Sequence, residues 1–304
     1  MGIFLSTPET YLVSVKNGLN LYVTAVLPSM LPFFFFSKLL TELDFAQSAG
    51  KVLKKPLRLL YNAPPAGGYI LLMSMLCGYP VGAKLVGEFY EKNLITEKEA
   101  KKLCAFTSTS GPLFLVGAVG YGMFSSKSCG FILLASHYFG TLLNGLLYRG
   151  KRVPPSETLP PSLISTDDLL NKTMLNTFLS VGLVGGYITI FNLFIDVAFQ
   201  TGLIPLLADA LALLNVNGRL ASGVAGGLLE MTKGCLLLSK AGFPILVTLP
   251  LCEFLVTFGG LCVTFQSLTF LSKTKISPAY YLLTKCTQGI LCSLLCFLLC
   301  LLVS

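Results

Sequence analysis

Four runs of apolar residues in this chain of 304 residues are each long enough to cross a lipid bilayer. A spanning helix needs about 20 predominantly apolar residues, because the hydrocarbon core is about 30 Å thick. Charged residues make up only 12% of the chain, whereas a soluble domain carries about 25%. The sequence therefore predicts an all-α polytopic membrane protein, with clear spans at 19–41, 131–148, 174–200 and 279–303.

Helix breakers interrupt two further apolar stretches in each half of the chain. Glycine frees the backbone, and proline removes a helical hydrogen bond. The same rule predicts a kink in the first span, which contains Pro28 and Pro32. The interrupted stretches are 68–90, broken at Gly78-Tyr79-Pro80; 103–124, broken at TSTSGP (107–112); 221–238, broken at Gly226-Gly227; and 243–271, broken at 257–260.

The basic residues indicate how these stretches are threaded, because cytoplasmic loops retain Lys and Arg. In the preferred threading, the first interrupted stretch of each half enters and returns as a re-entrant hairpin, and the second crosses as a broken helix. If all four crossed fully, the basic clusters at 98–102 and 149–152 would move outside. The hairpin threading leaves few basic residues outside, among them Lys16, Lys127 and Lys240. It places 14 on the cytoplasmic side, in the segments 41–66, 89–103, 149–175 and 272–277.

This threading gives each half of the chain three crossings. An odd number inverts the second half relative to the first, which is the inverted-repeat plan of many secondary transporters. An ungapped shift of 148 residues aligns Gly78 with Gly226 and Gly111 with Gly259, although few other residues are identical. We therefore predict a first membrane repeat at 1–150, a Pro- and Ser-rich cytoplasmic linker at 151–168, and a second, inverted repeat at 169–304.

The interruptions also predict a binding site, because unwound backbone at membrane depth must be buried in protein or line a wet cavity. In TSTSGP, the half-helix that follows would present free N–H groups suited to an anion. The alternative is an ordinary kink whose hydroxyls bond back to the helix. The corresponding segment TFGG in the second half favours the binding site. The predicted substrate-binding residues are Gly78, Tyr79, Lys84, Thr107, Ser108, Thr109, Ser110, Gly111, Glu230, Lys233, Thr257, Gly259, Gly260 and Lys285.

Ionisable residues within apolar stretches are a second signal, because they are costly in a membrane. Lys84, Lys233 or Lys285 would offset the charge of an anionic cargo. Alternatively, Lys84 with Glu88, and Lys233 with Glu230, neutralise each other on one helix face.

Three other ionisable residues have simpler alternatives. Asp196 and Glu253 are expected near helix ends, where they would be interfacial. His137 is the only histidine in the chain, and a lone histidine in an apolar helix is more often a hydrogen-bonded structural residue than a proton relay. It can titrate near neutral pH, so His137 and Glu88 are candidates for proton coupling.

The cysteine pattern predicts no metal site, and the net charge predicts no nucleic-acid binding. Cys292, Cys296 and Cys300 form a helical stripe with no His or carboxylate expected nearby, so we predict packing or a lipid-facing surface and no metal site. The net charge of +8 is attributed to cytoplasmic loops rather than to nucleic-acid binding.

The sequence also lacks the signatures of soluble enzymes. It contains no P-loop, HExxH or GxSxG motif. A catalytic triad would require the single histidine at mid-membrane, so we expect no enzymatic activity and no cofactor.

Two polar segments are expected to be helical. The stretch 44–62 is basic and amphipathic, which is typical of an interfacial helix. The stretch 91–102 carries Thr96 as a predicted N-cap with Glu99 three residues later, which is the spacing of a capping box.

The segments LPSMLPFFFFSKLL (27–40), GYPVGAK (78–84) and TSTSGPLF (107–114) closely resemble sporulation integral membrane proteins of the YlbJ type. The resemblance is dense over 18–150, and weaker but collinear over 176–300. Such proteins are placed in the nucleoside-recognition or Gate domain group, with the membrane parts of concentrative nucleoside transporters and of the bacterial ferrous-iron permease. The group name does not establish nucleoside binding, and the missing GTPase domain argues against iron transport.

The resemblance implies a bacterial endospore former and a transporter-like core in the cytoplasmic or forespore membrane. We therefore expect a permease for a small, anionic metabolite, with dipicolinic acid as the candidate cargo. Its expected partners are the lipid bilayer, the cargo, and either a second copy or other sporulation membrane proteins. A non-transporting scaffold for the spore envelope and a nucleoside-type transporter are the alternatives, and an intramembrane enzyme is the weakest.

Overall fold

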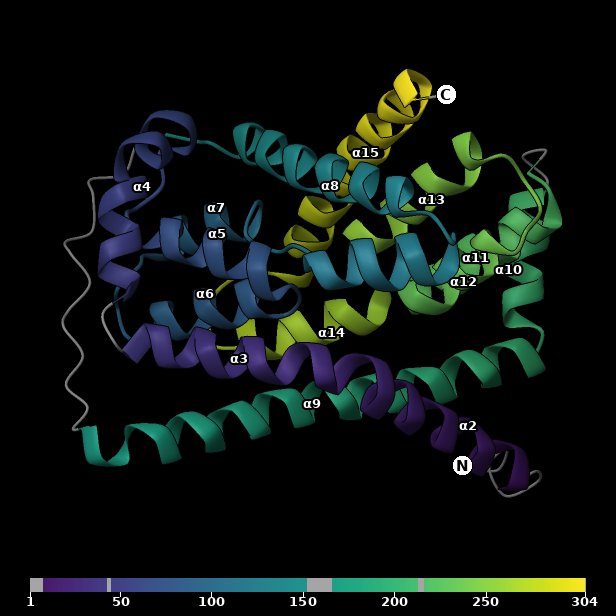
Figure 1. Ribbon diagram of the computed structural model, residues 1–304, viewed down its shortest axis with the longest axis horizontal. Helices are drawn as coiled ribbons and strands as arrows, with labels where there is room; N and C mark the ends of the chain where they lie inside the picture. Colours follow the sequence, from purple (N-terminus) through teal and green to yellow (C-terminus); the bar gives the residue numbers. More distant parts are fainter. Residues whose placement is uncertain (1–7, 43–44, 152–165, 213–215, 304) are drawn as a thin grey trace.

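The computed structural model describes residues 8–42, 45–151, 166–212 and 216–303, and within these ranges the chain forms helices and no strand (Figure 1). The predicted all-α class is confirmed. The first half contains α2 (Pro8–Leu21), the π-helical turn η1 (Tyr22–Val26), α3 (Leu27–Glu42), α4 (Phe45–Tyr61), α5 (Ala66–Cys77), α6 (Val81–Glu91), α7 (Glu97–Cys104), the π-helix η2 (Leu113–Met123) and α8 (Lys127–Leu147). The second contains α9 (Thr166–Gln200), α10 (Leu203–Ala212), α11 (Gly218–Leu229), α12 (Met231–Ser239), α13 (Ile245–Phe258), α14 (Gly260–Leu271) and α15 (Pro278–Val303).

Four stretches within the described residues are long and apolar enough to cross a membrane, so the multi-pass prediction holds. They are Lys127–Leu147, Asp168–Gln200, Ile245–Leu271 and Pro278–Val303. The predicted span at 19–41 is not a single regular helix, because η1 separates α2 from α3. Pro28 is the second residue of α3, and a proline ring crowds the carbonyl four residues earlier, here that of Thr24 in η1. In place of a simple kink, the predicted span contains a π-helical turn at Tyr22–Val26.

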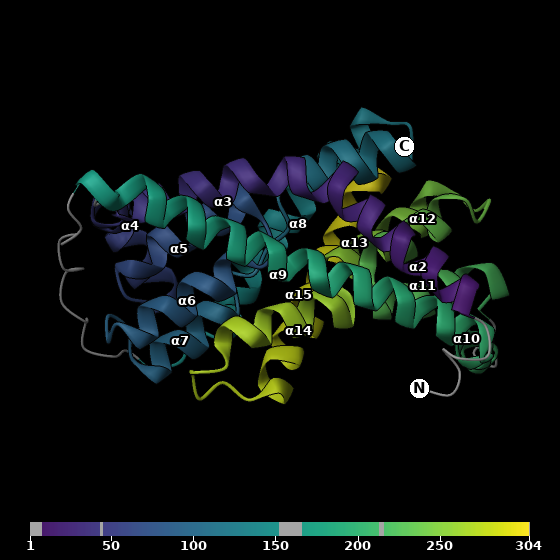
Figure 2. The ribbon, with the colours of Figure 1, turned by 90° about the horizontal axis from the view of Figure 1, so that it is seen from below.

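The longest helix, α9, runs the whole length of the molecule against α2 and α3 (Figures 1 and 2). At one end of α9, the chain segments that follow α4, α6, α8 and α14 come together. Asn62 donates to the Gly150 carbonyl over 3.0 Å, Lys102 donates to the Lys151 carbonyl over 2.6 Å, and Lys273 forms an ion pair with Glu91. The four segments predicted on one side of the membrane thus meet at one end of the molecule, apart from residues 43–44 and 152–165, which lie outside the described ranges.

The first helical hairpin turns where the sequence predicted. Helix α5 ends at Cys77, α6 begins at Val81, and Gly78 has φ = 80°. A Cβ atom on Gly78 would lie 2.6 Å from the backbone nitrogen of Gly111. The turn therefore needs glycine both for its left-handed φ and for the close approach of the unwound segment.

The second hairpin turns later in the chain than predicted, at Glu230 and not at Gly226-Gly227. Helix α11 continues through Gly226 and Gly227, and the break falls at Glu230, whose backbone is extended. Glycine is tolerated in a helix when packing requires it, and a Cβ on Gly227 would overlap the side chain of Leu255. The turn forms at Glu230 because its carboxylate caps the next helix, accepting from the backbone N–H groups of Thr232 and Lys233.

Both broken helices are present. Helix α7 ends at Cys104 and η2 starts at Leu113, so TSTSGP lies between them. Gly259, with φ = 83°, separates α13 from α14 within the predicted break at 257–260. The second half thus repeats the element order of the first: a long helix, a short one, a hairpin, a broken helix and a final helix. The inverted relation of the halves remains a prediction.

Two shorter elements also match the sequence analysis. Helix α4 occupies the predicted amphipathic stretch. Helix α7 begins with the predicted capping box, in which Thr96 accepts from the Glu99 backbone and the Glu99 side chain accepts from the Thr96 backbone. The predicted charged helix at 91–102 is therefore shifted to Glu97–Cys104.

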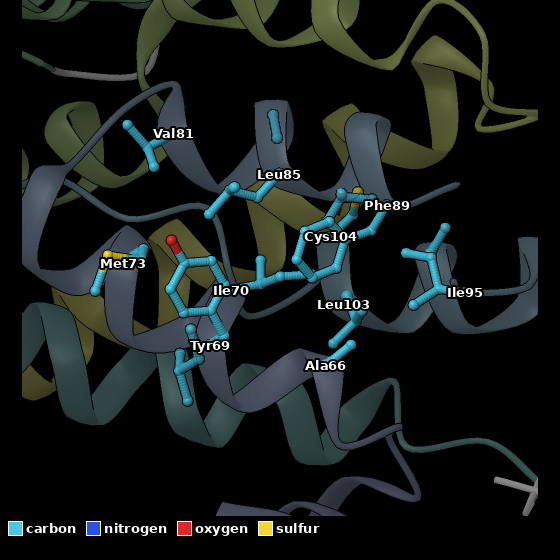
Figure 3. Close-up of a cluster of buried hydrophobic side chains, with 14 of the residues drawn as sticks. Ala66, Tyr69, Ile70, Met73, Val81, Leu85, Phe89, Ile95, Leu103 and Cys104 are labelled. Carbon is cyan, nitrogen blue, oxygen red and sulfur yellow. The ribbon is translucent and has the colours of Figure 1, made fainter. Parts of the chain in front are cut away.

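The hydrophobic core of the first half lies between α5, α6 and α7 (Figure 3). Tyr69 of α5 stacks on Phe89 of α6 with ring centroids 6.2 Å apart. Ile70, Leu103 and Cys104 complete the contact, and all five side chains are at most 2% exposed. This packing fixes the hairpin against the start of the unwound segment.

We predict that Gly82→Ala lowers the thermal stability of the purified protein. A Cβ at Gly82 would overlap the carbonyl oxygen of Thr107, and overpacking of this kind costs about 1–3 kcal/mol. Thermal unfolding in detergent measures the effect. The matched control is Gly182→Ala in α9, where a Cβ meets no atom within 4 Å. Equal unfolding midpoints for the two variants would contradict close packing of α6 on the unwound segment.

Candidate functional site

The unwound segment 107–111 lies at the centre of a buried polar network. The side chains of Thr107, Ser108, Thr109 and Ser110 are at most 2% exposed. Buried backbone polar groups need hydrogen-bond partners, and here the partners come from other helices. The alternative of a simple kink applies only to Thr107, whose hydroxyl donates back to the Leu103 carbonyl over 2.8 Å.

Helices α5, α8 and α15 each satisfy part of this segment. The Thr109 N–H donates to the Ser74 hydroxyl over 3.2 Å, and the Ser110 N–H donates to Nε2 of His137 over 2.9 Å. The Ser108 hydroxyl lies 2.9 Å from the hydroxyl of Tyr281. The segment is therefore held open by specific contacts from three helices.

Lys285 of α15 joins this segment to the first hairpin. Its fully buried side-chain nitrogen lies 2.9 Å from the Tyr79 hydroxyl, 2.9 Å from the Ser108 carbonyl and 2.9 Å from Oε1 of Gln288. The Tyr79 hydroxyl in turn donates to the Thr257 carbonyl over 2.9 Å. Three acceptors match the three N–H groups that an ammonium ion would donate, so every hydrogen bond that Lys285 can donate is made within the protein.

His137 of α8 forms the second centre of the network with Glu253 of α13. Because the Ser110 N–H must donate, Nε2 of His137 is an acceptor and carries no proton. The neutral ring then carries its proton on Nδ1, which lies 3.0 Å from Oε1 of Glu253 and 2.9 Å from the Thr257 hydroxyl oxygen. A doubly protonated ring would place two N–H groups against each other. Proton coupling through His137, if it occurs, therefore requires the Ser110 N–H to move away.

The cysteine stripe on α15 packs inside the protein, which is one of the two predicted alternatives, but its surroundings differ from the prediction. Cys292, Cys296 and Cys300 are at most 3% exposed within the described chain. The expectation of no His or carboxylate nearby is wrong, because helix packing brings His137 and Glu253 to Cys292, with one ligand atom of each within 4.8 Å of the others.

The hydrogen bonding nevertheless does not fit a metal at this group. A ligating histidine coordinates with one ring nitrogen and donates a proton from the other. In His137, Nε2 accepts from the Ser110 N–H, and Nδ1 carries the proton. The hydrogen bonds hold the ring in a tautomer in which Nδ1, the nitrogen that faces Glu253, carries the proton and cannot ligate.

A cavity of about 250 Å³ lies between the two hairpin tips, the first helix break and the beginning of α14. One wall consists of the α5–α6 turn and the residues around Gly111, and the opposite wall of the α11–α12 turn and the first turns of α14. Apolar side chains of α2, η1, α3 and α9 close the space between these walls. Its polar lining groups belong to Tyr79, Ser110, Glu230, Thr232 and Gln266.

The predicted site residues separate into two sets. Gly78, Tyr79, Ser110, Gly111 and Glu230 line the cavity. Thr107, Ser108, Thr109, Thr257, Gly259, Gly260, Lys84, Lys233 and Lys285 do not appear in its lining.

Lys84 and Glu88 lie in a separate cluster between α3, α6 and α9. Glu88 accepts from Lys38 of α3 over 3.2 Å and lies 3.9 Å from Lys84. Lys84 donates to the Ser180 hydroxyl of α9 over 2.7 Å. The expected pairing of Lys84 with Glu88 is thus one part of a cluster that ties the first hairpin to two neighbouring helices.

The expected pairing of Glu230 with Lys233 is wrong. Glu230 caps α12, and the ammonium group of Lys233 lies 2.5 Å from Asp196 of α9. Asp196 also accepts from the Ser14 hydroxyl of α2. The capping role removes the Glu230 carboxylate from the lysine three residues later.

Sequence reasoning missed three residues of the network. Glu253, expected near an interface, lies within α13 and is fully buried, and its Oε2 has no partner among the described residues. Gln288 donates to the Ser108 carbonyl and to Thr141, and Ser74 holds Thr109. The available signal was helical spacing, since Tyr281, Lys285 and Gln288 share one face of an otherwise apolar helix.

Comparison with known proteins identifies one clear relative. The chain is 30% identical over 312 residues to the sporulation integral membrane protein YlbJ of Bacillus subtilis (strain 168), and the match covers 94% of this chain and 76% of that protein. No protein-family model matches the chain. No solved structure gives a significant match.

We predict that Lys285→Met destabilises the protein by about 1–3 kcal/mol, the usual cost of leaving a buried polar group without its hydrogen-bond partner. The variant keeps the side-chain volume but leaves the Tyr79 hydroxyl, the Ser108 carbonyl and Gln288 with one partner fewer. Thermal unfolding in detergent is the measurement, and Lys240→Met, at an exposed position, is the control. A midpoint equal to that of the control would show that Lys285 does not hold the segment.

We also predict a fixed tautomer for His137. Because the chain has one histidine, ¹⁵N NMR of histidine-labelled protein reports this ring alone, and His137→Gln confirms the assignment. We expect protonated Nδ1 and unprotonated Nε2, with no change when Zn²⁺ is added. Loss of the Nδ1 proton on addition of zinc would instead identify His137, Glu253 and Cys292 as a metal site.

Proposed function

The chain belongs to the family of the sporulation integral membrane protein YlbJ, and from this membership we propose that it is a permease that moves a small metabolite across a membrane during spore formation. The observation that supports the proposal most directly is the cavity between two hairpin turns, the first helix break and the beginning of α14. Discontinuous helices that meet around a site near the membrane midplane are typical of secondary transporters. The family membership adds the link to spore formation.

The cavity limits the size and chemistry of the cargo. Its volume of about 250 Å³ lies just below the range of about 300–1,000 Å³ for small-molecule sites, so only a small cargo would fit. Its walls are mainly apolar, with a few polar groups at the turns, which suits a flat aromatic molecule with polar edges. Dipicolinic acid has this chemistry and remains our candidate cargo.

An anionic cargo would be stabilised by backbone rather than by lysine. Gly111 and Leu113 line the cavity at the start of η2, where the positive end of a helix dipole favours negative charge. The Ser110 hydroxyl lies beside them. A nucleoside is the second candidate, because Glu230 and Gln266 supply acceptors for hydroxyl or amino groups.

The contacts of the two hairpins support alternating access. Lys84, on the returning arm of the first hairpin, bonds to Ser180 of α9, and Lys233, on the returning arm of the second, pairs with Asp196 of the same helix. The side chains of Lys84, Lys233 and Asp196 are 12%, 30% and 28% exposed. Water therefore reaches these contacts in part, and breaking them costs only a modest free energy. We propose that α9 is the fixed support and that each hairpin releases its contact in turn.

We propose that the end of the molecule that carries α4, α7 and the start of α9 faces the cytoplasm. The positive-inside rule supports this orientation, because most of the basic residues lie in segments that meet at this end. The bacterial cytoplasmic membrane or the forespore membrane would hold the protein. A non-transporting scaffold for spore-envelope assembly is the alternative, and it would not require the cavity.

The test is uptake of labelled dipicolinate into liposomes that contain the purified protein. We expect flux above that of empty liposomes, and we expect Ala118→Phe to abolish it, because Ala118 lines the cavity and a benzyl group would fill it. Labelled uridine is measured in parallel to separate the two cargo candidates.

The control variant is Ala279→Phe, which makes the same substitution at an exposed position at the start of α15 and should keep the wild-type flux. If neither compound enters faster than into empty liposomes, the permease proposal fails for both cargoes. Flux that Ala118→Phe leaves intact would place the transport path outside the cavity.

A further inference from the structure

Helix α4 presents three distinct faces. Leu57 and Tyr61 are 3% and 5% exposed and pack against the protein. A second face carries the exposed apolar side chains of Phe45, Val52 and Leu59, which are 38%, 77% and 72% exposed and are spaced seven residues apart. Residues seven apart lie on one side of a helix, so these three project from the same outer side, which we call the apolar stripe of α4.

The third face of α4 is basic. Lys51, Lys54 and Lys55 are exposed and Arg58 is half-buried, and their spacing places them on one side of the helix, next to the apolar stripe. Among the described residues, none of the four forms an ion pair with a carboxylate, whereas Lys101 and Lys273 at the same end of the molecule pair with Glu97 and Glu91. The basic face of α4 is thus a concentration of charge that no carboxylate among the described residues pairs with.

The position of α4 brings both faces to the level of the membrane surface. The helix lies across the end of the molecule, at a steep angle to α3 and α9 (Figure 1). It directly follows the end of α3, and Asn62, just after α4, bonds to Gly150 just after α8. A basic amphipathic helix at the ends of membrane-crossing helices is suited to lie in the headgroup layer, with its long axis along the membrane plane.

We propose that the outer surface of α4 binds the headgroups of anionic phospholipids in the bilayer that holds the protein. The apolar stripe enters the boundary between headgroups and acyl chains, and the four basic residues contact phosphate and other anionic headgroup oxygens. The exposed apolar stripe distinguishes this partner from nucleic acid, which would leave Phe45, Val52 and Leu59 in water. This binding is independent of which cargo the protein carries.

The first test measures binding of fluorescent phosphatidylglycerol and fluorescent phosphatidylcholine to the full-length protein in neutral detergent. We expect a clear preference for phosphatidylglycerol. Replacing Lys51, Lys54 and Lys55 with Gln should weaken phosphatidylglycerol binding by at least about tenfold, since each basic residue near an anionic surface contributes a factor of about five.

The matched control is Lys92→Gln/Lys98→Gln/Lys275→Gln. It removes the same charge from three other exposed lysines at this end of the molecule and should keep the preference. Thermal unfolding of both triple variants establishes that each is folded. The proposal would be overturned if the wild type bound phosphatidylglycerol and phosphatidylcholine equally. It would also be overturned if the two triple variants lost phosphatidylglycerol binding equally, because net charge alone would then explain the binding.

The second test identifies the lipid as part of the same bilayer. Hydrogen exchange of the full chain is measured in two kinds of nanodisc, each of which contains a single bilayer. One bilayer is phosphatidylcholine alone, and the other is phosphatidylcholine mixed with phosphatidylglycerol. Slower exchange over 45–61 in the anionic nanodiscs, lost in the α4 triple variant but not in the control, supports the proposal. Equal exchange in the two nanodiscs contradicts it.

Discussion

The unwound segment 107–111 can exist in a buried region only because other helices supply its hydrogen-bond partners. An unsatisfied buried polar group costs about 1–3 kcal/mol, and this segment contains several in succession. Ser74 of α5, His137 of α8, and Lys285 and Gln288 of α15 satisfy them. The arrangement of these helices, and the cavity next to Gly111, therefore depend on the same set of contacts.

The ionisable residues follow from the same constraint, because a charge in the membrane must be paired or hydrogen-bonded. In the described structure, two of the buried or partly buried pairs join different helices. Lys233 meets Asp196 across α12 and α9, and His137 meets Glu253 across α8 and α13. Such contacts hold the hairpins and the broken helices in register, which a pair within one helix cannot do.

Several features could be predicted from local sequence, and others could not. The turn at Gly78 and the break at Gly259 were predicted because glycine acts on its own backbone. The second hairpin turn was misplaced at Gly226-Gly227, because those glycines serve helix packing while Glu230 caps the following helix. Glu253 was misjudged for a related reason: its partner His137 is 116 residues away in the chain.

The sequence by itself determined that this is an all-α, multi-pass membrane protein with interrupted helices, because hydropathy, proline and glycine act over short distances along the chain. Its motifs also indicated the family that the comparison with YlbJ then established. Only the tertiary structure decided which polar groups meet: that Lys285 bonds to Tyr79 and Ser108, that His137 accepts from Ser110, and that the lysines lie outside the cavity lining. Those contacts join residues far apart in the chain, and they form only when the helices pack.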